Sequence, residues 1–69
     1  MDNAERVKVF LAERKGRFFC NRCLGETLYI HNSAQLNQAT RPLRGVKPYR
    51  NGKVICHSCG QDRECIAHG

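Results

Sequence analysis

The residues best suited to chemistry in this chain are two Cys-x-x-Cys pairs, Cys20 with Cys23 and Cys56 with Cys59. A tight turn of this spacing lets two thiolates take adjacent corners of a tetrahedral metal shell, and two such turns complete it. The sequence therefore predicts one structural Zn²⁺ ion held by these four cysteines. Because four protein ligands leave no position for a water molecule, we expect no catalysis at the metal.

Other uses of these thiols are less favoured. Iron in a rubredoxin-like site would take the same ligands, but nothing in the sequence indicates an electron-transfer surface. A redox Cys-x-x-Cys motif usually begins a helix in a βαβ framework, which this chain is too short and wrongly ordered to build. Either His31 or His68 could replace a cysteine in a Cys3His site, whereas His57, inside the second turn, is expected outside the shell. The fifth thiol, Cys65, is predicted to be a small buried hydrophobic residue.

The size of the chain leads us to expect that a metal ion or disulfides stabilise it. Its 69 residues form a single domain, residues 1–69, in which apolar burial barely offsets the entropy of ordering. An odd number of cysteines, five, suits complete disulfide pairing poorly but suits two metal-binding pairs and one leftover thiol. Residues 1–19 carry charges throughout, so they predict neither a signal peptide nor a membrane span. We expect a cytoplasmic protein, where thiols stay reduced.

The charge distribution points to an anionic partner. The formal net charge is +6, and four thiolates with one divalent ion would lower it by two. Residues 31–53 contain no acidic residue but five basic ones, which are Arg41, Arg44, Lys47, Arg50 and Lys53. A basic stretch of this kind is typical of a nucleic-acid-binding surface.

The apolar pattern predicts two helices before residue 31. The first runs from Asn3 to Lys15, with Asp2 or Asn3 as its cap and Gly16 as its end. Its inward side chains, spaced at the helical repeat, are Val7, Phe10, Leu11 and Arg14. Phe18 and Phe19 then enter the core. The second helix runs from Arg22 to Ile30, and the residues available for its inner face are Cys23, Leu24, Thr27 and Leu28.

A third helix is predicted over residues 34–41, capped by Asn32 or Ser33. Pro42 lacks an amide donor and clashes with the preceding turn, so the helix is expected to end near Thr40 or to kink before Leu43.

The last part of the chain predicts a β-hairpin. Its strands are residues 53–56 and 62–66, and its tip is the Cys-x-x-Cys-Gly turn. Asn51-Gly52 is a competing hairpin turn, and residues 67–69 are expected to be frayed.

Three helices followed by a β-hairpin resemble a winged helix-turn-helix domain. The segment CLGETLYIHNSAQLNQATRPLR resembles the helix-turn-helix, and KVICHSCGQDRECI resembles the wing. The whole chain is also similar to small zinc-binding bacterial proteins, through Phe-Cys-x-x-Cys-Leu at residues 19–24, Asn-Gln-x-Thr-Arg-x-Leu at residues 37–43 and Cys-x-x-Cys-Gly at residues 56–60. The resemblance implies an α+β fold, a small zinc-stabilised winged-helix-like domain whose hairpin carries a zinc knuckle.

In winged helices the helix after the turn enters the major groove of DNA. Glutamine and asparagine can pair with adenine, and arginine with guanine or phosphate. If Leu36, Ala39, Thr40 and Leu43 pack inward, the polar side chains of this helix point outward, and the small Ala34 could approach a thymine methyl group. The expected nucleic-acid-binding residues are Gln35, Asn37, Gln38, Arg41, Arg44, Lys47, Arg50 and Lys53, with the last three at phosphates.

The sequence thus favours binding of double-stranded DNA, in transcription regulation, with a homodimer or a protein partner adding contacts because one helix buries little DNA surface. The alternative is a structural zinc module that acts as a protein-interaction adapter. An RNA-binding zinc ribbon is disfavoured, because only Tyr29 and Tyr49 remain for base stacking. No carboxylate pair, activated nucleophile or phosphate loop can be assembled, so we expect no enzyme, no small-molecule substrate and no membrane partner.

Overall fold

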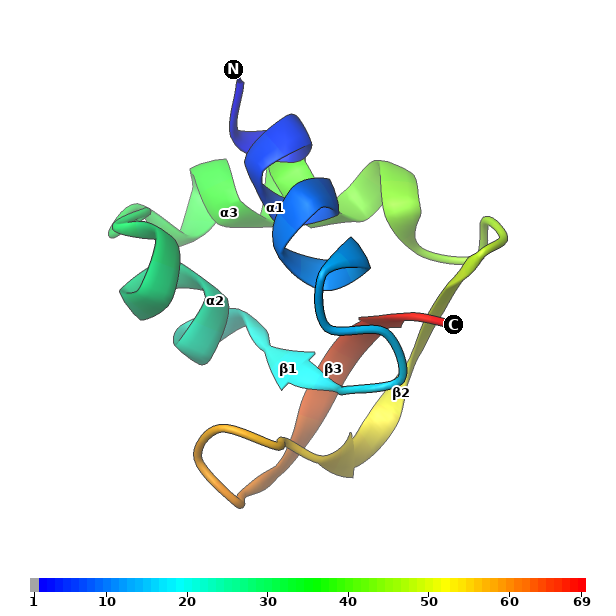
Figure 1. Ribbon diagram of the computed structural model, residues 1–69. Coiled ribbons are helices and arrows are strands. Elements are labelled where there is room, and N and C mark those ends of the chain that lie inside the picture. Colours follow the sequence, from blue (N-terminus) through cyan, green and yellow to red (C-terminus); the bar gives the residue numbers. More distant parts are fainter. Residues whose placement is uncertain (1) are drawn as a thin grey trace.

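The structure is a computed structural model that describes residues 2–69 as an α+β fold of three helices and a three-stranded antiparallel sheet (Figure 1). The elements in chain order are α1 (Asn3–Ala12), β1 (Phe19–Cys20), α2 (Asn21–Leu28), α3 (Ser33–Thr40), the 3₁₀ helix η1 (Arg41–Leu43), β2 (Tyr49–Ile55) and β3 (Asp62–His68). The expected α+β class is confirmed. The strand order β1-β3-β2 places the last strand at the centre of the sheet. None of the helices described is long and apolar enough to cross a membrane.

Helix α1 begins as predicted but ends at Ala12, three residues before the expected Lys15. The Asp2 side chain caps it by accepting a hydrogen bond from the Glu5 amide at 2.8 Å. Past Ala12 the chain tightens into turns, since the Arg14 amide bonds three residues back to Leu11. The inward face is confirmed, because Val7, Phe10 and Leu11 are buried, and the Arg14 guanidinium lies over the Phe10 ring.

Gly16 completes this turn. Its φ of +82° is the left-handed conformation that glycine adopts freely, and its amide donates to the carbonyl of His68 at 2.9 Å. The loop after α1 is therefore attached to the end of β3.

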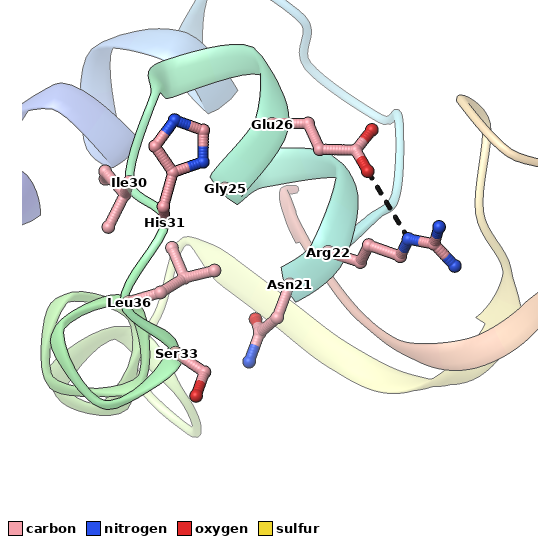
Figure 2. Close-up of a pocket in the computed structure, with 8 residues that line it drawn as sticks. All are labelled: Asn21, Arg22, Gly25, Glu26, Ile30, His31, Ser33 and Leu36. Carbon is pink, nitrogen blue, oxygen red and sulfur yellow. Dashed lines mark hydrogen bonds and ion pairs between the residues drawn. The ribbon is translucent and has the colours of Figure 1, made fainter.

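Helix α2 also ends early, at Leu28 instead of Ile30, because Tyr29 adopts a left-handed φ of 57°. Cys23 and Leu24 are buried as expected, but Thr27 is exposed, so its predicted inward position is wrong. Gly25 is buried in its place. A Cβ at Gly25 would lie 2.8 Å from the Ile30 carbonyl oxygen and 3.3 Å from a Leu36 methyl group, so the absent side chain lets the turn and α3 pack close to α2 (Figure 2).

Helix α3 matches its prediction closely. Asn32 caps it by accepting hydrogen bonds from the amides of Ala34 and Gln35. The α-helix ends at Thr40, and Pro42 lies in the 3₁₀ turn that follows, which confirms the earlier of the two predicted ends. The four predicted inward residues, Leu36, Ala39, Thr40 and Leu43, are all buried.

The hairpin is longer than predicted. Strand β2 pairs with β3 along its whole length, from Tyr49 opposite His68 to Ile55 opposite Asp62. Asn51-Gly52 lies inside β2, so the competing hairpin turn is wrong. The predicted frayed end is also wrong, because Ala67 is buried and the Gly69 amide donates to the Pro48 carbonyl at 2.7 Å. The reason is that the C-terminal residues are paired on one edge with β2 and anchored to Gly16 on the other.

Strand β1 was not predicted, and it divides the buried residues between two faces of the sheet. Phe19 pairs with Ile66 and Cys20 with Cys65; because successive residues of a strand point to opposite faces, these two pairs face opposite ways. The first face belongs to the helical core, which consists of Val7, Phe10, Leu11, Phe19, Leu24, Ile30, Leu36, Ala39, Leu43 and Ile66. The second belongs to the cysteine cluster, Cys20, Cys23, Cys56 and Cys65. Phe18, expected in the core, is half-buried against the cysteine cluster instead.

Candidate metal centre

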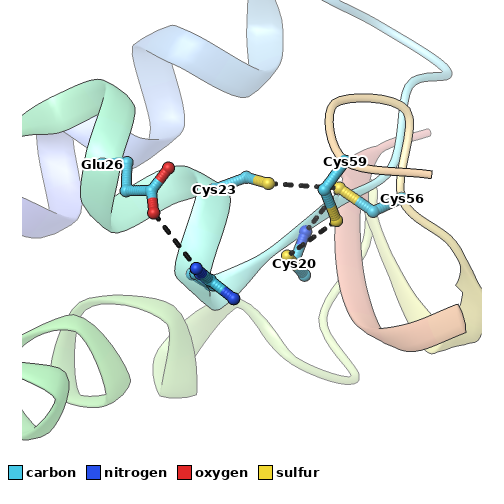
Figure 3. Close-up of polar contacts among 6 residues, drawn as sticks. Cys20, Cys23, Glu26, Cys56 and Cys59 are labelled. Carbon is cyan, nitrogen blue, oxygen red and sulfur yellow. Dashed lines mark hydrogen bonds and ion pairs between the residues drawn. The ribbon is translucent and has the colours of Figure 1, made fainter. Parts of the chain in front are cut away.

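The fold brings the two Cys-x-x-Cys turns together. Cys20 ends β1, Cys23 lies in the first turn of α2, and Cys56 and Cys59 lie at the tip of the hairpin, residues 56–61 (Figure 3). The four sulfur atoms all lie within 4.8 Å of one another. Residues that are far apart in the sequence therefore form one compact donor set.

The distances suit a tetrahedral metal ion. Four sulfurs at about 2.3 Å from a zinc ion would lie about 3.8 Å from one another. The Cys23 and Cys56 sulfurs are 3.6 Å apart, and the Cys20 and Cys59 sulfurs are 3.9 Å apart. A disulfide would need about 2.05 Å, and all five cysteines are free. These four cysteines lie close enough to hold a metal ion.

Backbone hydrogen bonds shape the hairpin tip and attach it to the first turn. The Cys56 sulfur accepts from the amides of Cys20 and Ser58, both at 3.4 Å. The His57 amide donates to the Phe18 carbonyl at 2.8 Å, and Gly60, with a left-handed φ of 73°, donates to the Cys56 carbonyl at 2.9 Å. The sulfur positions are thus set by the chain itself.

Three of these thiols, Cys20, Cys23 and Cys56, differ in their pKa. Burial raises the pKa of Cys56, but hydrogen bonds from the amides of Cys59, Cys20 and Ser58 outweigh it and lower that pKa to about 6. Burial raises the pKa of Cys23 to about 12 and also raises the pKa of Cys20. One thiolate is therefore stabilised by the protein alone, whereas the buried Cys23 and Cys20 need a nearby positive charge to ionise, which a metal ion would supply.

The remaining candidate ligands lie outside this donor set. Within residues 2–69 the possible metal-binding group contains only the four cysteines, so neither His31 nor His68 joins it. His57 is exposed, and the His68 ring packs against Tyr49. Cys65 is buried as predicted, and its thiol donates to the Arg63 carbonyl at 3.1 Å.

The structure brings together only part of the predicted nucleic-acid-binding set. A groove of about 440 Å³ is lined by Ala34, Asn37, Gln38, Arg41 and Arg44, all of which are exposed. The other predicted residues do not line this groove: Gln35 lies beside the start of α1, Lys47 is in the loop before β2, and Arg50 and Lys53 are on β2. Since Arg50 and Lys53 are three residues apart on a strand, they point to opposite faces.

One residue that sequence reasoning missed connects the metal centre to the groove on α3. Asn21, inside the first Cys-x-x-Cys turn, donates its side-chain amide to the Asn37 side chain on α3 at 2.7 Å. No spacing rule indicates this bond, because it depends on how α2 and α3 pack. Asn37 is thereby held against α2, which leaves Gln38, Arg41 and Arg44 as the free polar side chains of the groove.

The fold and the donor set define a small α+β protein whose four cysteines can hold a metal ion. Comparisons of the chain with protein-family models, curated proteins and solved structures found no match.

Across residues 2–69 one ion pair is present, between Arg22 and Glu26 at 3.4 Å. The arginines of the groove therefore have no acidic partner among the described residues.

Proposed function

We propose that this chain is a zinc-stabilised DNA-binding module of the winged helix-turn-helix kind, in which α3 enters the major groove. The observation that carries the proposal is the groove on the exposed face of α3 and η1. It gathers an amide side chain, Gln38, and two guanidinium groups, Arg41 and Arg44, without an acidic residue among those that line it. Glutamine can read adenine, and arginine can read guanine or hold a phosphate.

The element order supports the proposal. Helices α2 and α3 are joined by residues 29–32, a turn of the length found in helix-turn-helix motifs. Strand β1 lies between α1 and α2, and the β2–β3 hairpin follows α3, where a wing would be expected. The close approach of Ile30 and Leu36 to Gly25 packs the turn and α3 against α2, and the polar face of α3 is exposed.

In this proposal the ion has a structural role. Cys20, Cys23, Cys56 and Cys59 would hold it, and it would supply positive charge that keeps their thiolates ionised. The cross-link would fasten the wing to the start of α2. Because free thiols need a reducing compartment, the proposal places the protein in the cytoplasm, with a role in transcription regulation.

The small size of the groove limits how much DNA one copy of the chain could contact. A single short helix covers one half-site, so we propose that a second copy or a partner protein completes the contact with DNA. Lys47 and Arg50, which do not line the groove, would add phosphate contacts. Lys53 is the weakest member of the set, because it lies opposite Glu64 across the hairpin.

The test is a titration of the zinc-loaded protein against labelled duplex DNA at several salt concentrations, with single-stranded DNA and RNA as controls. We expect affinity for the duplex to fall steeply with salt. Arg41→Ala should weaken duplex binding about tenfold. Lys15→Ala, which removes the same charge from an exposed turn outside the groove, serves as the matched control. Equal losses in both variants would mean that net charge, and not the groove, determines binding.

A second candidate is the protein-interaction adapter, and one observation favours it. A hollow of about 340 Å³ lies between α2 and α3, with Gly25, Ile30 and Leu36 at its floor and Arg22, Glu26 and His31 around it (Figure 2). Absence of duplex binding even at low salt, in protein shown to contain zinc, would favour this candidate over DNA binding.

A further inference from the structure

The four candidate metal ligands are not equally protected. Cys20, Cys23 and Cys56 are buried, whereas Cys59 is exposed. The Cys56 sulfur accepts hydrogen bonds from the backbone amides of Cys20 and Ser58. Among the described residues, the polar contact found for the Cys59 sulfur is with the Cys20 sulfur, at 3.9 Å (Figure 3).

Cys59 lines a hollow of about 260 Å³. Its lining residues are Arg22, Cys23, Glu26, Cys59, Gln61 and Arg63. A small polar molecule can therefore reach Cys59 from solvent without any movement of the fold. Arg22 and Arg63 line the hollow together with Glu26, which pairs with Arg22 at 3.4 Å. Arg63, for which no such ion pair is found among residues 2–69, can stabilise an anionic leaving group.

Accessibility and thiolate character decide which cysteine an oxidant attacks. A thiol that coordinates a metal ion is deprotonated, so each ligand would be a thiolate. Burial limits the access of reagents to Cys20, Cys23 and Cys56, and Cys23, although it also lines the hollow, is only 6% exposed. Cys59 is then the ligand that combines thiolate character with the greatest access.

We propose that Cys59 is the site at which hydroperoxides oxidise the metal centre. The inference rests on the metal site of the proposed function, but not on DNA binding. It assigns Cys59 a chemical role beyond its structural one, with Cys20 as the second thiol that takes part.

The reaction has two steps. The Cys59 thiolate attacks one oxygen of the hydroperoxide; the S–O bond forms, the O–O bond breaks, and hydroxide or alkoxide leaves and takes up a proton. Sulfur loses two electrons and becomes a sulfenic acid, while the peroxide is reduced. The Cys20 thiolate then attacks the Cys59 sulfur; the S–S bond forms, the S–O bond breaks, and hydroxide leaves to become water.

Two observations favour Cys20 as the partner over Cys65. The Cys20 sulfur lies 3.9 Å from that of Cys59, and a modest movement of the exposed hairpin tip would bring the two together. The Cys65 thiol is instead directed to the carbonyls of Arg63 and Val54. Formation of the disulfide would remove two of the four ligands, so the metal should leave and the hairpin tip should separate from α2.

The experiment uses the full chain loaded with one zinc ion, treated with hydrogen peroxide below one equivalent. Dimedone traps the sulfenic acid, and peptide mass spectrometry locates it. A chromogenic chelator follows zinc release in parallel samples without dimedone. We expect dimedone first at Cys59, then a Cys20–Cys59 disulfide that appears together with free zinc and is reversed by a thiol reductant.

Two variants sharpen the result. Cys59→His keeps four ligands but removes the accessible thiolate, so zinc release by peroxide should slow at least about tenfold. Cys65→Ser should release zinc at the rate of the unmodified chain. First labelling at a cysteine other than Cys59, or equal release rates for Cys59→His and the unmodified chain, would overturn the inference.

The mapping on the unmodified chain decides the question even if Cys59→His fails to bind zinc. A chain that binds no zinc would overturn both this inference and the proposed metal site. A chain that binds zinc but is not oxidised at Cys59 would overturn this inference alone.

Discussion

The helical core and the cysteine cluster pack on opposite faces of β3, where Ile66 points to the first and Cys65 to the second. The helical core draws apolar residues from α1, α2, α3, η1 and the sheet, and each contributes a share of buried area. On the side of the cysteine cluster, in contrast, the sulfurs of Cys20, Cys23, Cys56 and Cys59 form a single donor set, which closes only when both Cys-x-x-Cys turns are present. The comparison indicates that substitutions in the helical core should have graded effects, whereas loss of one metal ligand should have an all-or-none effect.

The difference matters because of the size of the chain. A chain of 69 residues buries a small core, and its total stability is expected to be about 5 to 15 kcal/mol. A structural zinc site contributes about 10 to 16 kcal/mol in small zinc-binding peptides. If zinc occupies the donor set, these magnitudes predict that the helical core depends on the metal for its stability.

The largest effect should therefore follow metal removal. Treatment of zinc-loaded protein with a strong chelator is expected to unfold the whole chain, including the helical core, and Cys20→Ser should do the same. Loss of amide chemical-shift dispersion and of far-UV circular dichroism measures the change, and recovery after zinc is added back is the control. A metal-free chain with native dispersion would show that the helical core folds without the metal, and would contradict the expected all-or-none effect.

A graded effect is expected from Leu24→Ala. Leu24 is fully buried on α2, so its truncation should lower the free energy of unfolding of the zinc-loaded protein by about 2 to 5 kcal/mol. Zinc stoichiometry should stay at one per chain. Thr27→Ala, on the exposed face of the same helix, is the matched control and should change stability by less than about 0.5 kcal/mol. Denaturant unfolding with metal analysis measures both quantities, and loss of zinc in Leu24→Ala would mean that the two regions are not separable.

Gly25→Ala should change the free energy of unfolding by a smaller amount. The sign of the change shows whether close packing at Gly25 or helix propensity is the larger contribution. Propensity alone favours alanine by about 1 kcal/mol. The added Cβ would lie 2.8 Å from the Ile30 carbonyl oxygen, a backbone atom that cannot move without disturbing the turn. We expect a net loss of about 1 to 3 kcal/mol in the free energy of unfolding. Gly52→Ala, where a Cβ meets nothing within 4 Å, is the control, and a stabilised Gly25→Ala protein would contradict the packing described for α2 and α3.

Sequence patterns predicted the parts of the molecule that depend on local periodicity or spacing. The inward face of α3 follows from the helical repeat, because packing at that period needs no knowledge of the rest of the chain. The grouping of the four cysteines follows from two short spacings and the chemistry of thiolates. Pro42 predicted the end of α3 because its missing amide acts locally.

Features that depend on distant contacts could not be read from the sequence. Strand β1 has two residues, too few for an alternating pattern, and it exists because β3 pairs with it. The ordered C-terminal residues depend on Gly16 and β2. In the sequence Gly25 indicates only an interruption of the helix, because its contacts with Ile30 and Leu36 come from other parts of the fold. The pattern predicts an inward Thr27 because the residue that is buried there, Gly25, has no side chain to signal it. In each case the deciding partner lies on another element.

The smallest expected effect concerns the hydrogen bond from Asn21 to Asn37. It joins the first Cys-x-x-Cys turn, which carries two of the metal ligands, to α3, which belongs to the helical core. Both side chains are at the surface, so the bond should contribute only about 0.5 to 1 kcal/mol. A double-mutant cycle with Asn21→Ala, Asn37→Ala and the double variant isolates this energy, because an independent pair of substitutions would be additive. Unfolding free energies of the zinc-loaded proteins provide the measurement. A coupling energy in this range would show that the first Cys-x-x-Cys turn helps to hold α3 in place. Strict additivity would mean that the cysteine cluster acts on α3 only through the backbone of α2, and that Asn37 is as free to meet a ligand as Gln38.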